Sequence, residues 1–187
     1  PVGNQTNEVV LDNDDPGVTW AGGWANSSSA IFFGSAGDVP YRFCNAAATE
    51  TATATYTPNI PQPGFYPVYC WALAGNNRTN QLYKVFHTGG QSHVRVPHHL
   101  TGGGWVYLGT YFFNVGSNTA IGSVQISNLG NHGVATGVVI ADAIRFGNGM
   151  GVNHPRAQQT GAVQRLETHA GPVEAVVRHA QIGDQRP

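Results

Sequence analysis

The feature that most constrains this chain is a series of short segments in which apolar and polar residues alternate, separated by glycine, proline and asparagine. Such alternation is typical of half-buried strands, and no segment between them is long enough for a crossover helix. The sequence therefore predicts an all-β fold, an antiparallel β-sandwich of jelly-roll type. We expect strands at residues 8–12, 30–33, 41–44, 52–57, 65–73, 82–87, 93–96, 105–113, 123–127 and 138–146.

The charge content narrows the class of protein further. Only 10% of the residues are charged and the formal net charge is −1, against roughly 25% charged residues in an ordinary soluble domain. The basic residues are scattered, so we expect no nucleic-acid partner. We also expect no membrane span, because no apolar run approaches the roughly 18 residues required. The N-terminus is not a signal peptide, so a secreted protein would be a processed chain or a fragment.

A glycine pair predicts the clearest local element, a hairpin whose two-residue turn is Gly89-Gly90. This turn would pair residue 88 with residue 91. The face that carries Tyr83, Val85, Val94 and Val96 would then point to the core.

The composition changes after residue 151. From Val152 onward the chain contains no aromatic residue, and apolar residues recur at helical spacing around Gly171-Pro172. We therefore divide the chain into a sandwich at residues 1–151 and a C-terminal tail at residues 152–187. The tail is expected to form two short amphipathic helices or to be partly ordered.

The two cysteines, Cys44 and Cys70, lie in expected strands. They are either buried free thiols or a disulfide, which would stabilise the fold by about 3 kcal/mol in the chain-entropy model. We favour the disulfide because the composition looks extracellular.

Catalytic and metal-binding patterns are scarce. The eight histidines lack metal-ligand spacing, the adjacent His98 and His99 would point to opposite faces, and no nucleophile motif or facing carboxylate pair is apparent. We expect no catalytic residue and no cofactor, with one exception. Asp12 and Asp14 lie in a turn-like acidic segment that could bind Ca²⁺ or form ordinary turn hydrogen bonds. Asp142, inside an apolar strand, is expected to be structural, with a backbone turn or Arg145 as its partner.

Aromatic residues near loops are the remaining functional signal. Flat rings can stack on sugar faces, and amide and guanidinium groups can bond sugar hydroxyls. The predicted ligand-binding residues are therefore Trp20, Trp24, Tyr107, Asn76, Asn77 and Arg78.

Four motifs occur in an order that resembles a known family. They are Val9-Val10-Leu11-Asp12-Asn13-Asp14-Asp15-Pro16-Gly17 with the two following tryptophans, the stretch from Ala54 through Pro63-Gly64-Phe65-Tyr66-Pro67-Val68-Tyr69, Gly103-Gly104-Trp105-Val106-Tyr107-Leu108-Gly109-Thr110-Tyr111, and Val139-Ile140-Ala141-Asp142-Ala143-Ile144-Arg145-Phe146. Over residues 8–147 the chain resembles the golvesin C-terminal-like domain, also described as the xanthan-lyase carbohydrate-binding-like domain.

The resemblance implies a β-sandwich accessory domain of secreted bacterial proteins, here most like versions attached to N-acetylmuramoyl-L-alanine amidases. The 36 residues after Gly151 carry no matching catalytic motif, so amidase activity is not implied.

Three functional hypotheses follow. The first is a non-catalytic extracellular or cell-surface domain that binds carbohydrate or a cell-envelope polymer, with polysaccharide or peptidoglycan as partner. The second is a structural subunit of an extracellular filament, sheath or surface layer, a homo-oligomer formed through the tail. The third is a fragment of a cell-wall amidase without its catalytic part.

Overall fold

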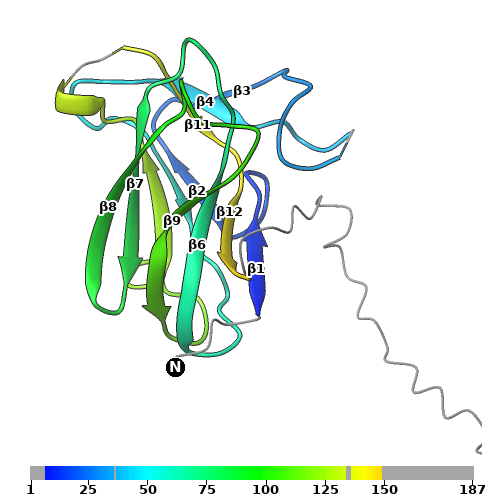
Figure 1. The fold of residues 1–187 in the computed structure, drawn as a ribbon, viewed down its shortest axis with the longest axis vertical. Helices are drawn as coiled ribbons and strands as arrows, with labels where there is room; N and C mark the ends of the chain where they lie inside the picture. Colours follow the sequence, from blue (N-terminus) through cyan, green and yellow to red (C-terminus); the bar gives the residue numbers. More distant parts are fainter. Residues whose placement is uncertain (1–6, 36, 134–135, 149–187) are drawn as a thin grey trace, which may run out of the picture.

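The computed structural model of the protein describes residues 7–35, 37–133 and 136–148. It confirms an all-β fold in which every strand pair is antiparallel. One sheet has four strands in the order β1-β12-β6-β9 and a second has five in the order β2-β5-β10-β7-β8. A third sheet, β11-β4-β3, lies across one end of the other two, at the top of Figure 1.

The strand bounds are β1 Glu8–Leu11, β2 Val18–Ala21, β3 Ala25–Asn26, β4 Arg42–Asn45, β5 Thr53–Tyr56, β6 Gly64–Ala72, β7 Asn80–His87, β8 Gly90–Pro97, β9 Gly104–Phe113, β10 Ser123–Ser127, β11 Val138–Ala141 and β12 Ile144–Gly147. A short 3-10 turn, Asn131–Gly133, lies between β10 and β11.

The core is made of the alternate side chains that the two large sheets turn toward each other. On β6 these are Tyr66, Val68 and Cys70, and on β10 they are Val124 and Ile126, all 0–1% exposed. Alternation along each strand separates this inner face from the outer one. Alternation would predict polar residues on the outer face of β6 and β9. That face is nevertheless rich in aromatic residues.

The turn of the β7–β8 hairpin differs from the predicted one, but the face predicted to point to the core is correct. The two residues of the turn are Thr88 and Gly89, and His87 pairs with Gly90. The register is therefore shifted by two residues from the predicted one. A shift of two leaves every side chain on its original face, so Tyr83, Val85 and Val96 still point to the core.

Two expected segments are also corrected. Residues 30–33 form no strand; they belong to the loop that carries Phe33 onto Trp71 and Trp105, with ring centroids 5.4 and 5.1 Å apart. The strand β2 was not expected. The single strand predicted over residues 138–146 is two strands, because the chain leaves the three-stranded sheet at Asp142-Ala143 and enters the four-stranded one.

The predicted disulfide is wrong: both cysteines are buried free thiols. Cys44 lies on β4, where it pairs with Val139 of β11, and Cys70 lies on β6, where it pairs with Ile144 of β12. The two strands belong to different sheets. Burial raises the pKa of both thiols to about 12, which keeps them protonated and unreactive.

The predicted tail, residues 152–187, lies outside the described residues, so its helices stay a prediction. Within the described ranges no helix is long and apolar enough to cross a membrane.

Candidate functional site

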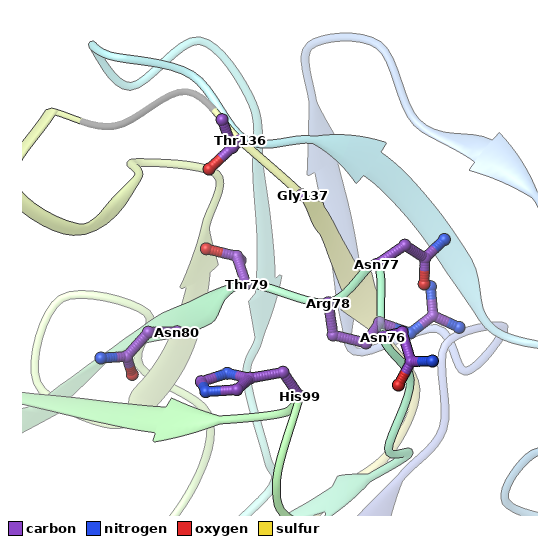
Figure 2. A pocket seen from close by; sticks show the side chains of 8 residues that line it. All are labelled: Asn76, Asn77, Arg78, Thr79, Asn80, His99, Thr136 and Gly137. Carbon is purple, nitrogen blue, oxygen red and sulfur yellow. The ribbon is translucent and has the colours of Figure 1, made fainter.

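A polar pocket of about 530 Å³ opens at the end of the sandwich where the loops gather. It is lined by the segment Asn76–Asn80, which connects β6 to β7, by His99 after β8, and by Thr136 and Gly137 before β11. Figure 2 shows the side chains of Asn76, Asn77 and Arg78 gathered on one side and those of Asn80 and His99 on the other. Three of the six predicted ligand-binding residues, Asn76, Asn77 and Arg78, are thus brought together.

Backbone hydrogen bonds fix the loop that carries these residues. Val138 N donates to Asn77 O over 2.7 Å, Thr79 N donates to Val138 O over 3.2 Å, and Gly75 N donates to His98 O over 3.2 Å. The close approach requires glycine at position 137, where φ is +90° and a Cβ would lie 3.1 Å from Asn77 O. The pocket is therefore built from backbone that three segments hold in place.

Arg78 is the charged group of the pocket. Its Nη2 donates to the hydroxyl of Tyr41 over 2.7 Å, and its guanidinium carbon lies 5.3 Å from the centre of the Tyr41 ring. Its Nε is buried and has no hydrogen-bond partner within the described residues, and the same is true of Asn80 Oδ1. Because both atoms are buried, a ligand in the pocket would meet the exposed parts of these two side chains and not these atoms.

A buried polar network lies behind the pocket wall. His98 is 0% exposed, and its Nε2 is 2.9 Å from the hydroxyl of Tyr83. Gln81 Nε2 donates to that hydroxyl and to Ile140 O, each over 2.7 Å. Burial lowers the pKa of His98 to about 4, and the charge of Arg78 acts in the same direction. The two adjacent histidines do face opposite ways, since His98 is buried and His99 is exposed in the pocket.

The three predicted aromatic residues lie outside this pocket. Trp20 and Trp24 contact each other edge to face at 5.2 Å, and the guanidinium of Arg42 lies 4.4 Å from the centre of the Trp20 ring. The indole N–H of Trp24 donates to Ala21 O and Thr53 O. These contacts make the pair part of the packing of β2 and β5.

Tyr107 is 49% exposed on the outer face of β9, where it neighbours Tyr69 at 5.4 Å. Arg145 is buried beneath this face, with its guanidinium 4.2 Å from the Tyr69 ring centre, 4.9 Å from that of Trp105 and 3.7 Å from a Glu8 oxygen. Tyr107 therefore belongs to an aromatic surface on the sheet, away from the pocket.

Asp142 is held by the backbone, one of the two partners that we expected. Its carboxylate accepts from Phe33 N over 3.0 Å, and its own carbonyl accepts from the Tyr56 hydroxyl over 2.6 Å. Burial and the nearby Asp12 raise the pKa of the Asp142 carboxyl well above its usual value. Arg145 contacts the aromatic rings instead.

The predicted calcium ligands occupy a compact turn. Asp12 is 1% exposed, its Oδ1 accepts from Asn13 N over 2.7 Å, and its own N–H donates to Asp15 Oδ2 over 2.7 Å. Asp14 is exposed. Within the part of the chain that the structure describes, no three His, Cys, Asp or Glu side chains gather as a metal site would require. Calcium binding at Asp12 and Asp14 stays a prediction.

The sequence did not reveal Tyr41, Thr79, Asn80 or His99 as site residues. Thr79 and Asn80 continue the Asn76–Arg78 run, so their proximity was the available signal. Tyr41 and His99 come from distant segments, and only the folded chain brings them to Arg78.

Comparison with known proteins gives a consistent result. The family model described as the golvesin C-terminal domain matches residues 9–148. A xanthan lyase of Bacillus sp. (strain GL1) is 37% identical over 142 residues, which are 74% of this chain and 14% of that protein. The chain thus spans about one seventh of the curated relative that it matches.

Solved structures agree with the fold. A Paenibacillus xanthan lyase superposes with a TM-score of 0.64 at 34% identity, over 77% of this chain and 13% of that one. A Podospora anserina GH26-CBM35 β-(1,4)-mannanase gives a TM-score of 0.51 at 16% identity, over 80% of this chain and 30% of that one. The second likeness concerns the fold alone.

Proposed function

Because this chain belongs to the golvesin C-terminal domain family, we propose that it is a non-catalytic accessory domain that binds carbohydrate in the pocket at the end of the sandwich. The observation that carries the proposal is the lining of that pocket. Amides, a guanidinium and an imidazole converge there from three segments of the chain. Such groups donate to and accept from sugar hydroxyls.

The size and rigidity of the pocket support this role. A volume of about 530 Å³ falls within the range of small-molecule sites. Because backbone hydrogen bonds already hold the 75–79 loop, a ligand would not need to order it, and less binding free energy would be lost.

The homologue supports the choice of ligand class. It is a xanthan lyase, xanthan is a polysaccharide, and this chain matches one seventh of that protein. A polysaccharide partner and an extracellular location are therefore proposed for this chain too. Peptidoglycan remains a further proposed partner.

The non-catalytic role is supported by the positions of the carboxylates. Glu50 accepts from Lys84 and from the hydroxyl of Ser127, and Asp142 accepts from a buried backbone N–H. None of the described residues that line the pocket is acidic, so general acid catalysis by a pocket carboxyl is not part of the proposal.

The hypotheses of a filament, sheath or surface-layer subunit and of an amidase fragment depend on residues 152–187, which the structure does not describe. Light scattering of the full chain at rising concentration tests the first of them, since a polymer subunit would grow in mass.

The carbohydrate proposal is tested by affinity electrophoresis of the full chain in gels that contain neutral or acidic polysaccharides, or on insoluble peptidoglycan. We expect retention by at least one polymer. The double variant Asn76→Ala/Asn77→Ala should weaken that retention about tenfold, because two hydrogen bonds worth about 0.5–1.5 kcal/mol each are lost.

The matched control is Asn59→Ala/Asn114→Ala, which changes two exposed asparagines that do not line the pocket. It should bind as the unmodified chain does. Equal weakening in both double variants would place the binding surface elsewhere, and no retention on any polymer would contradict carbohydrate binding.

A further inference from the structure

We propose that the pocket selects a sugar that carries a carboxylate, and that Arg78 is the residue that recognises this charge. The proposal rests on the carbohydrate-binding function and names the class of sugar. It starts from the position of Arg78, which lines two pockets.

The second pocket that Arg78 lines has a volume of about 340 Å³. Its lining includes Ile31, Tyr41, Leu73 and the backbone at Gly102 and Gly103. It is therefore less polar than the first pocket. A Cβ at Gly103 would meet no atom within 4 Å, so the backbone there is open to a ligand.

Among the residues that the structure describes, none that lines either pocket carries a carboxylate. The two ion pairs among the described residues join Lys84 to Glu50 and Arg145 to Glu8, and neither involves Arg78. Within the described part of the chain, no acidic group in the pocket walls thus balances the positive charge of Arg78. A ligand carboxylate would supply that balance.

The guanidinium also has the donors that a carboxylate requires. Of its five N–H groups, the structure pairs one, through Nη2, with Tyr41 within the described part of the chain. The packing against the Tyr41 ring fixes the plane of the group. Because Nε is buried, the donors for a ligand carboxylate would be the N–H groups of Nη1 and Nη2 that do not bond Tyr41. A planar guanidinium that is fixed in this way and keeps unused N–H groups can bind a carboxylate with two parallel hydrogen bonds.

A glycan that crosses Arg78 would meet different chemistry on each side. Its hydroxyls would face the amides of Asn76, Asn77 and Asn80 in the first pocket. The apolar C–H face of the next sugar would lie over Ile31 and Gly103 in the second. The two pockets together therefore fit at least two linked sugars, with the carboxylate at Arg78.

The test compares acidic polysaccharides with their own carboxyl-reduced forms, which keep the backbone and lose the charge. Alginate, polygalacturonate and xanthan, each in both forms, would be cast in affinity gels with the unmodified full chain. We expect at least one acidic polymer to retard the protein, and carboxyl reduction to weaken that retardation at least tenfold. This comparison needs no variant, so it does not depend on how a substitution folds.

Variants then assign the effect to Arg78. Arg78→Gln should lose the preference for the acidic polymer, and Arg78→Lys should keep part of it. Lys84→Gln is the matched control, because it removes the same charge outside both pockets. Thermal unfolding of each variant checks that the fold is intact.

The outcomes separate the two proposals. Equal binding of acidic and reduced polymers would overturn the acidic-sugar inference and leave carbohydrate binding standing. Equal losses in Arg78→Gln and Lys84→Gln would overturn the role of Arg78. Failure to bind any polymer, charged or neutral, would contradict the proposed function itself.

Discussion

His98 is 0% exposed, and burial lowers its pKa from 6.5 to about 4. Between these two values the unfolded chain binds a proton that the folded chain does not bind. The contribution of His98 to the free energy of unfolding is therefore fully present above pH 6.5. This contribution is lost as the pH falls toward 4. The loss amounts to about 3 kcal/mol, from about 1.4 kcal/mol per pKa unit. His98→Gln should remove this part of the pH dependence.

Urea unfolding of both proteins at intervals from pH 4 to 7.5 measures the effect. Asp142 has a raised pKa and acts in the opposite direction, but it is present in both chains and cancels in their difference. His99→Gln, at the exposed neighbour, is the control and should follow the unmodified chain. Parallel curves for His98→Gln and the unmodified chain would show that His98 is not the cause.

Single residues also show which contacts could not be predicted from the sequence. The apolar strand around Asp142 indicated correctly that the carboxylate must be bonded. The donor, Phe33 N, is 109 residues away along the chain, and no local pattern could identify it. The cysteines were misassigned for a related reason: a sequence does not show how close two strand residues lie in the fold, and both thiols are free.

Among the elements, the loop that carries Asn76–Arg78 depends on Gly137. Gly137→Ala would place a Cβ against Asn77 O at a φ of +90°. We expect it to lower the free energy of unfolding by about 1–2 kcal/mol and to weaken polysaccharide binding several-fold, because Asn77 must move.

Gly116→Ala is the matched control for that prediction. Its φ is +88° but a Cβ there would meet nothing within 4 Å, and Gly116 lines neither pocket. It should have a similar backbone strain and unchanged binding. Urea unfolding and affinity electrophoresis measure the two effects separately, and unaltered binding in Gly137→Ala would contradict the coupling between this glycine and the pocket.

The elements themselves were predictable where alternation is long and regular. The strands β6, β7 and β9, with eight to ten residues each, were expected within two residues of their ends. The four-residue strand β2 was missed because so short an alternation does not stand out from a loop. The apolar run at 30–33 was misread, since an apolar loop residue that covers a sheet gives the same signal as a strand.

For the whole molecule, the first and last strands pair with each other. Glu8–Leu11 of β1 lies against Ile144–Gly147 of β12, in register from Glu8↔Gly147 to Leu11↔Ile144. The family match ends at the same place, residue 148. All strands of the described structure are thus contained in residues 8–147.

A chain ended after Asn148 should therefore fold and bind as the full chain does. We expect its midpoint of thermal unfolding to stay within about 3 °C, which corresponds to less than about 1 kcal/mol for a domain of this size. A chain that begins at Asp12 is the control: without β1, the edge of β12 loses its partner and the midpoint should fall by more than 10 °C. Circular dichroism measures both midpoints. A large fall in the chain ended at 148 would mean that residues 149–187 stabilise the sandwich, whereas a change only in its mass by light scattering would assign to them a role in association.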